Sequence, residues 1–291
     1  MTAVTASPRK RRRRGGRRAL RRTLLNLAGL VVFAVMVFPV YWMVSTAFKP
    51  GIEITSYTPK WFPDAPTLVH FTDAIRKPGF WEGVRNSLIV VSVVVAASMV
   101  LAFLAAVALA KYRFNGRRAF IVLVILIQML PANALVIPLY VTLARYEQVN
   151  TLSGLAVTYM TFVLPFSIWV LRGFILGIPK DLEEAAMVDG NSRFTAFVKI
   201  LLPLVVPGLV ATSIFAFIQA WNEFIFAYIL LSSQEKQTLT VWLASFLGTS
   251  RGTDWGGLMA GATLTAIPVV IFFLIVHRRI AFGLTSGAVR G

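Results

Sequence analysis

Long apolar runs separated by short polar segments dominate the amino-acid sequence. Six runs reach the roughly 20 residues that a helix needs to cross the hydrocarbon core of a bilayer. These runs are residues 24–48, 87–110, 119–143, 152–176, 204–231 and 258–276. Because lipid offers no hydrogen-bond partner to the backbone, each run is predicted to be helical. The pattern therefore predicts an all-α integral membrane protein with six transmembrane helices.

The composition agrees with this prediction and narrows the possible chemistry. Charged residues make up 14% of the chain, whereas soluble domains carry about a quarter. Hydrophobic residues make up 57%, and the mean hydropathy is +0.73. The absence of cysteine excludes disulfides, thiolate metal sites and cysteine nucleophiles. The two histidines, His70 and His277, are too few and too far apart for a histidine metal site, so no metal site is predicted.

The basic residues set the predicted orientation in the membrane. An even number of spans puts both termini on one side, together with the loops after the second and fourth runs. That side carries 21 of the 29 lysines and arginines, and the positive-inside rule makes it cytoplasmic. The net charge of +17 is then a basic cytoplasmic rim beside anionic lipid head groups, and no nucleic-acid binding is predicted.

Residues 1–22 form a strongly basic segment ahead of the first apolar run. The two together resemble a signal peptide, but the run is roughly 25 residues long, against about 7–15 in a signal peptide, and no Ala-x-Ala site closes it. The first run is therefore predicted to be an uncleaved anchor. Like charges repel in residues 1–22, which are predicted to be a disordered cytoplasmic tail. Residues 23–291 are predicted to form the membrane domain.

The loop 177–203 between the fourth and fifth runs carries the most informative pattern, and its first half is predicted to be a short helix. Pro179 can open a helix, because its missing amide costs nothing in the first turn. Glu183 and Glu184 follow in the early turns, where negative charge suits the helix dipole. The next two residues, both alanine, give a slim and strongly helical surface that fits into a groove.

The second half of this loop is predicted to be a turn followed by another helix. Gly190 after Asp189 can take the left-handed conformation that ends a helix. Asn191 or Ser192 can then cap the helix that leads towards the membrane. A short helix, a glycine turn and a second helix at this place form a peg that another protein can grip. The alternative is a structural hairpin without a partner.

This loop resembles the signature of the permease subunits of binding-protein-dependent ABC importers. The matching positions are Glu184, Ala185, Ala186, Gly190, Ile200, Leu202 and Pro203. Further motifs resemble the second permease subunit of maltose-type carbohydrate importers, over roughly residues 24–291. They are Phe38-Pro39, Ser45 to Lys49, Asn86-Ser87, Pro131, Ile137 to Tyr140, Trp221-Asn222-Glu223-Phe224 and the terminal Gly283 to Gly291. One departure is Arg290, which stands where that family has lysine.

The resemblance implies the type I ABC importer permease fold in a bacterial inner membrane, with both termini cytoplasmic. It implies a second homologous permease, two ATPase subunits that bind ATP and Mg²⁺, and an extracellular sugar-binding protein that delivers an oligo- or disaccharide. No cofactor is expected on this chain itself. The implied ATPase-coupling residues are Glu184, Ala185, Ala186, Asp189 and Gly190. The implied contacts with the binding protein, in the loop before the sixth run, are Thr249, Ser250, Arg251, Gly252 and Thr253.

Polar residues inside apolar runs are costly and are often functional. The fifth run holds Gln219, Asn222 and Glu223, and the third holds Gln128 and Asn133. Amides and carboxylates beside aromatic rings can line a sugar path. The alternative is that these side chains form hydrogen bonds between helices, including helices of a partner subunit.

Other classes of protein fit the sequence less well. A Walker-type phosphate loop is absent, so ATP hydrolysis must belong to a separate protein. The zinc-protease and serine-hydrolase motifs are absent too, and no catalytic residue is predicted. A secondary transporter would place several ionisable residues within its spans, and this chain offers little besides Glu223. An ABC permease for a non-sugar solute is the nearer alternative. The sequence does not identify the sugar.

Overall fold

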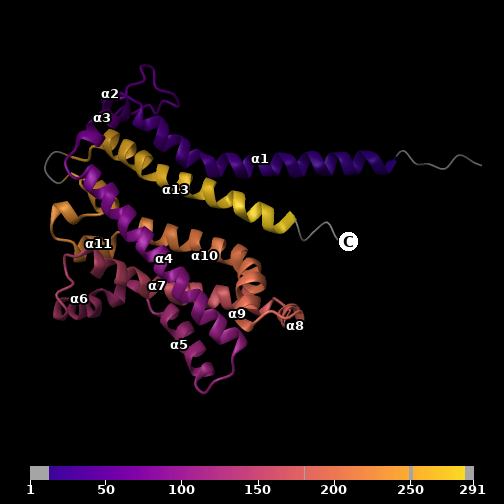
Figure 1. Ribbon diagram of the computed structural model, residues 1–291. Coiled ribbons are helices and arrows are strands. Elements are labelled where there is room, and N and C mark those ends of the chain that lie inside the picture. Colours follow the sequence, from indigo (N-terminus) through magenta and orange to yellow (C-terminus); the bar gives the residue numbers. More distant parts are fainter. Residues whose placement is uncertain (1–12, 180, 249–251, 286–291) are drawn as a thin grey trace, which may run out of the picture.

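The computed structural model describes residues 13–179, 181–248 and 252–285, and within these ranges it contains helices and no strand (Figure 1). The elements in chain order are α1 (Arg13–Ala47), α2 (Gly51–Ile54), α3 (Val69–Arg76), α4 (Phe80–Lys111), α5 (Arg117–Met129), η1 (Ala132–Leu135), α6 (Val136–Arg145), α7 (Leu152–Leu176), α8 (Asp181–Val188), α9 (Arg193–Ala196), η2 (Phe197–Leu201), α10 (Leu202–Asn222), α11 (Ile225–Leu230), η3 (Gln234–Lys236), α12 (Leu239–Ala244) and α13 (Trp255–Thr285).

Five helical segments are long and apolar enough to cross a membrane, and a bent pair makes six if its two parts form one span. The five segments are Leu20–Ala47, Phe80–Lys111, Leu152–Leu176, Arg193–Asn222 and Trp255–Val276. The prediction of an all-helical, multi-pass membrane protein is confirmed. The first residue of α1, the last turns of α13 and helix α8 lie at the same end of the molecule (Figure 1). That arrangement fits the predicted topology, in which this end faces the cytoplasm.

The core is built by α4 packed along α7 and α10. At the end that carries α8, small side chains of α4 lie against larger ones of α7 and α10, and the cluster includes Ala102, Ala106, Leu171, Leu201 and Val205. Small residues let membrane helices approach closely. Gly208 of α10 permits one such close contact with α7, because a Cβ there would lie 2.7 Å from the ring of Phe174. A larger cluster fills the opposite end.

Helix α1 lies beside α13 and is otherwise largely uncovered (Figure 1). All side chains of residues 20–40 are exposed, so this helix needs lipid or another subunit around it. The helix begins at Arg13. The sequence analysis expected a disordered tail over residues 1–22, whereas the structure describes 13–22 as the first turns of α1, and arginines are good helix formers. Residues 1–12 lie outside the described part of the chain.

The third apolar run is not one straight span, as the sequence had suggested, but two helices. Helix α5 stops at Met129, and the axis of the following pair η1 and α6 is bent from it by 98°. Pro131 explains the break, because it lacks an amide hydrogen and disfavours helical conformation in the preceding residue. Leu130 is indeed extended, with ψ at 128°.

The fifth run also differs from the expected single helix. Helical structure starts before the predicted run, at Arg193, and passes through the π-helical turn η2 into α10. Pro203 stands in the first turn of α10, where a missing amide is tolerated and a widened turn gives its ring space. At the other end α10 stops at Asn222, because Glu223 is extended with ψ at 131°. The short helix α11 follows.

Candidate functional site

Helix α8 protrudes at the end of the molecule where α4 and α7 finish (Figure 1). Four of the five predicted coupling residues are exposed: Glu184, Ala185, Asp189 and Gly190. The fifth, Ala186, is buried and faces the protein. Large apolar side chains that the sequence analysis did not single out are exposed around them, namely Leu182, Met187, Val188 and Phe194. An acidic first turn beside exposed apolar side chains gives α8 a surface suited to a protein partner.

The turn after α8 has the predicted conformation. Gly190 adopts φ +88°, which glycine alone takes without strain. The amide of Asn191 and its side-chain Nδ2 each donate to the carbonyl of Ala186, both at 3.0 Å. Ser192 caps α9 by accepting a hydrogen bond from the amide of Thr195 at 3.2 Å. The helix–turn–helix geometry of this loop therefore follows from its own residues.

An ion pair between Lys111 and Glu183 fastens α8 to the membrane helices. Lys111 is the last residue of α4, and each of the two side chains is 20% exposed. Partial burial makes such a pair more sensitive to the loss of one partner than a surface pair, because the remaining charge is left without compensation. The sequence analysis missed this contact. The sign that could have indicated it is a lone lysine ending a long apolar run.

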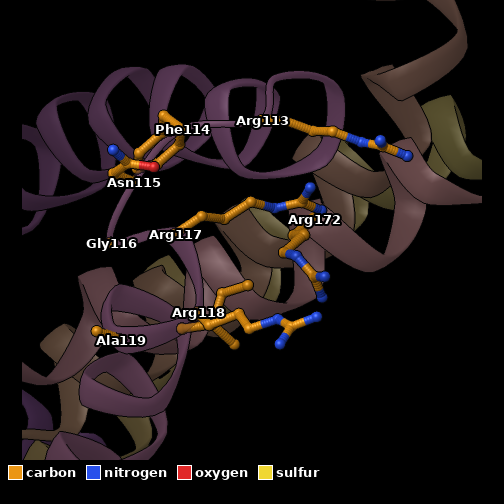
Figure 2. Close-up of a pocket in the computed structure, with 9 residues that line it drawn as sticks. Arg113, Phe114, Asn115, Gly116, Arg117, Arg118, Ala119 and Arg172 are labelled. Atoms are coloured by element: carbon orange, nitrogen blue, oxygen red, sulfur yellow. The ribbon is translucent and has the colours of Figure 1, made fainter.

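A hollow of about 940 Å³ lies beside this connection, between the 112–119 segment and the end of α7 (Figure 2). Arginines line much of it: Arg113, Arg117, Arg118 and Arg172. None of the predicted coupling or path residues borders this hollow. It is therefore separate from the sites that the sequence analysis proposed.

Four of the five predicted path residues meet at one cavity of about 290 Å³ nearer the opposite end: Asn133, Gln219, Asn222 and Glu223. The break at Pro131 brings Asn133 of η1 to the end of α10. Gln128 does not reach this cavity; its side chain donates to the carbonyl of Val124 one turn back. Tyr159 and Phe162 of α7 also line the cavity and were not predicted. A hydroxyl within the fourth apolar run was the available signal for Tyr159.

Glu223 has a structural task within this cavity. Its carboxylate accepts hydrogen bonds from the amides of Phe226 at 2.8 Å and Ala227 at 3.1 Å, and so caps α11. Its carbonyl accepts from the hydroxyl of Thr240 at 2.8 Å. The Asn222 side chain donates to Ile218 of its own helix at 3.0 Å. None of these hydrogen bonds of Glu223 and Asn222 joins two membrane spans. Hydrogen bonds between spans were the alternative role considered for these residues.

The start of α4 holds the loop 231–254 in place. Asn86 is almost fully buried, and its Nδ2 donates to the carbonyls of Glu235 at 2.8 Å and Gln237 at 3.0 Å. The hydroxyl of Ser87 accepts from the amide of Leu239 at 2.8 Å. The Asn-Ser pair at the beginning of the second apolar run is thus the attachment point of a distant loop.

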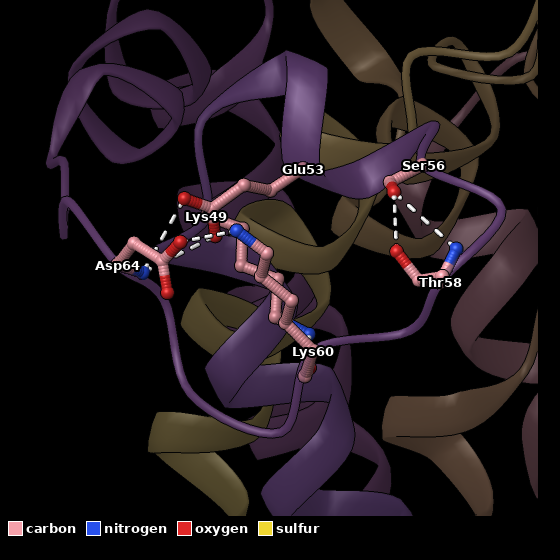
Figure 3. Close-up of polar contacts among 6 residues, drawn as sticks. All are labelled: Lys49, Glu53, Ser56, Thr58, Lys60 and Asp64. Atoms are coloured by element: carbon pink, nitrogen blue, oxygen red, sulfur yellow. Dashed lines mark hydrogen bonds and ion pairs between the residues drawn. The ribbon is translucent and has the colours of Figure 1, made fainter.

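A second loop, residues 49–67, folds over the end of α1 (Figure 3). Lys49 is buried, donates to the carbonyl of Lys60 at 2.6 Å and lies over the ring of Trp42 at 4.1 Å. Burial lowers the pKa of Lys49, and the carboxylate of Glu53 partly offsets this shift. Glu53 also accepts from the amide of Asp64, which forms an ion pair with Lys60.

The residues predicted to contact a binding protein lie only partly within the described structure. Thr249, Ser250 and Arg251 are outside it. Gly252 has φ +82°, and its carbonyl would lie 2.0 Å from a Cβ at Gly248, so the backbones of these two glycines lie close together. Thr253 precedes the cap of α13, where Asp254 accepts from the amide of Gly257 at 2.9 Å. No group of side chains that could hold a metal ion occurs in the described residues.

A polytopic helical membrane protein with a protruding helix at one end and a polar cavity nearer the other has the parts of a transport subunit. Residues 98–286 match the family described as binding-protein-dependent transport system inner membrane component. The match covers more than half of the chain, and the chain belongs to this family. Its fold is similar to that of a bacterial ABC transporter involved in the import of alginate, with a TM-score of 0.75 at 22% identity over 94% of this chain and 99% of the other.

Two curated relatives illustrate the similarity in sequence. The chain is 47% identical to the diacetylchitobiose uptake system permease protein DasC of Streptomyces coelicolor, over 91% of this chain and 96% of that protein. It is 33% identical to the trehalose/maltose transport system permease protein MalG of Thermococcus litoralis, over 94% of this chain and 98% of that protein. The predicted membership of the carbohydrate-type permeases is thereby confirmed.

Proposed function

We propose that this chain imports sugars as one of two permease subunits of an ATP-driven, binding-protein-dependent transporter. The observation that carries the proposal is the continuous helical segment Arg193–Asn222, which leads from the α8 loop to the cavity at Gln219. At 1.5 Å per residue its 30 residues span about 45 Å, enough to cross a bilayer. One element thus joins the surface for a partner to the cavity for a solute.

The partner at α8 in this proposal is a separate ATPase. Two such subunits bind ATP and Mg²⁺, and their closure moves α8 and the corresponding helix of a companion permease. The Lys111–Glu183 pair carries the movement to α4, and the segment through η2 carries it to α10. The permease itself is then no enzyme. This end of the molecule is the cytoplasmic one, in a bacterial inner membrane.

A second, homologous permease is the proposed neighbour within the membrane. The uncovered side chains of residues 20–40 and the exposed lining of the cavity support this, since a closed path needs walls that this chain lacks. The extracellular sugar-binding protein docks at the opposite end, on the loops 49–67 and 231–254. The sugar is a short oligosaccharide, because the curated relatives are named for diacetylchitobiose, trehalose and maltose.

The cavity supports a sugar as the solute. Amide groups of Asn133, Gln219 and Asn222 can donate to and accept from hydroxyls, and the ring of Phe162 offers an apolar face. A charged solute would favour a counter-charge in the cavity. The only ionisable carboxylate in its lining, Glu223, is already engaged in capping α11.

Purification of the tagged full chain from native membranes in mild detergent tests the proposal. A P-loop ATPase, a second polytopic permease and an exported binding protein should co-purify, as identified by mass spectrometry. Uptake of labelled diacetylchitobiose, trehalose and maltose by cells with and without the gene then identifies the sugar. Recovery of the chain alone, after crosslinking from Glu184, would overturn the proposal. Normal uptake of every tested sugar without the gene would overturn the sugar assignment.

A further inference from the structure

The hollow between the 112–119 segment and α7 gathers four positive charges at one place. Arg113, Arg117 and Arg118 come from the loop after α4 and the start of α5, and Arg172 comes from the last two turns of α7. Figure 2 shows their guanidinium groups arranged beside one another and directed into the same space. Four like charges around one hollow repel one another, and an anion between them would relieve this repulsion.

No protein carboxylate supplies that anion in the described residues. The lining of the hollow contains no aspartate or glutamate. The ion pairs found among all the described residues join Lys60 to Asp64 and Lys111 to Glu183, and neither includes an arginine. In addition, Nε of Arg172 is buried without a hydrogen-bond partner. Buried donors are normally paired, and an unpaired one indicates a missing partner.

We propose that this hollow binds the phosphate head group of an anionic phospholipid. Guanidinium groups pair with phosphate oxygens through two parallel hydrogen bonds, which makes arginine well suited to phosphate. The volume of about 940 Å³ is far larger than a phosphate ion needs and leaves room for a glycerol backbone. Basic hollows between membrane helices on the cytoplasmic side are typical places for anionic lipid head groups.

The apolar surroundings favour a lipid over a free anion or an acidic protein. Ile121 and Ala119 line the hollow beside the arginines, and the ring of Phe114 is 47% exposed at its edge. From there the outer surface of α5 continues with exposed Phe120, Val122 and Leu123. An acyl chain can lie along this surface while its phosphate stays with the arginines. A carboxylate surface of a soluble protein would leave these apolar side chains uncovered.

Native mass spectrometry of the purified full-length protein tests the proposal. The probes are phosphatidylglycerol and phosphatidylcholine with the same oleoyl chains. Wild-type protein should retain phosphatidylglycerol in preference to phosphatidylcholine. The variant with Arg113→Gln and Arg118→Gln should lose at least about tenfold of this binding, since each basic residue near a membrane surface strengthens it several-fold. Both side chains are exposed, so the substitutions leave the core untouched.

The matched control replaces two exposed arginines elsewhere on the same side, Arg21→Gln with Arg22→Gln. This variant should bind phosphatidylglycerol like the wild type. A second variant, Arg117→Gln with Arg172→Gln, examines the two deeper guanidinium groups. Equal retention of both lipids by the wild type, or unchanged retention by both hollow variants, would overturn the proposal.

Two further experiments distinguish a lipid from a free phosphate, and a lipid from an acidic protein. If glycerol 1-phosphate or inorganic phosphate displaces the bound lipid completely at millimolar concentration, the ligand is a free anion and the lipid assignment is wrong. If the hollow variants keep the lipid but no longer retain an ATPase during purification, the arginines bind an acidic protein. The readout is lipid mass and not transport, so it stays independent of the proposed function.

Discussion

The α8 loop and the cavity around Gln219 are held in place by different means. The loop is shaped by neighbours in sequence: an acidic first turn, a glycine at φ +88° and the cap at Ser192. The cavity is assembled from η1, α7 and α10, and the distant loop 231–254 is held by Asn86 of α4. The difference indicates that changes in the loop will affect coupling to a partner, whereas changes around the cavity will affect assembly or solute affinity.

The largest effect is expected from Gly190→Pro in the α8 loop. Proline cannot adopt φ +88° and removes the hydrogen bond from the amide of Gly190 to Met187. Uptake in cells should fall to background, with the amount of protein in the membrane unchanged. The control is Gly190→Asn, since asparagine tolerates the left-handed conformation and should retain most uptake. Charge reversal at Glu184 should also abolish uptake. Normal uptake by both the proline and the charge-reversal variants at wild-type expression would show that α8 does not couple.

A large loss of stability is expected from Asn86→Leu. This change removes the two hydrogen bonds that the buried Asn86 side chain donates to the carbonyls of Glu235 and Gln237. The free energy of unfolding in detergent should fall by about 1–3 kcal/mol, because each hydrogen bond contributes roughly 0.5–1.5 kcal/mol. The control is Asn133→Leu, at an exposed position, which should change stability by less than about 0.5 kcal/mol. Similar losses in the two variants would contradict the anchoring role of Asn86.

A smaller effect on transport is expected when the ion pair that fastens α8 to α4 is broken. Lys111→Glu and Glu183→Lys each leave a partly buried charge facing a like charge. Each should lower the uptake rate about tenfold, in line with the cost of breaking a buried pair. The variant that combines both substitutions restores the pair in the opposite order and should recover most of the rate. If the uptake rate of the combined variant is no higher than that of either single variant, the ion pair is not part of the coupling route.

The smallest effect is expected inside the cavity. Gln219→Ala should raise the sugar concentration for half-maximal uptake about three- to tenfold, the equivalent of one lost hydrogen bond of about 1 kcal/mol. The maximal rate should change little, because α8 and its ion pair with α4 stay intact. The control is Gln128→Ala, whose amide lies outside the cavity and bonds within its own helix. Equal effects of the two substitutions would show that the cavity is not part of the sugar path.

Features set by neighbouring residues were predicted better than features set by contacts between distant elements. The predicted run 152–176 has the same first and last residues as helix α7. A long apolar stretch between polar ends must be helical in lipid, because no other partner is available to its backbone. The turn at Gly190 was also correct, since its signals are local. The third run was expected to be a single helix but forms α5 and the bent pair η1 and α6, although Pro131 was visible. Whether a proline bends a membrane helix or breaks it by 98° depends on what surrounds it.

The sequence by itself determined the class of protein, the number of apolar runs and the helix–turn–helix of the α8 loop. These features depend on hydrophobicity, charge and short-range capping, which a chain carries without reference to its fold. Only the tertiary structure decided that Asn133 and Gln219 share a cavity, that Gln128 lies outside it and that Lys111 binds Glu183. The reason is that such contacts join residues far apart in the chain, and their geometry is set by how the helices bend and pack.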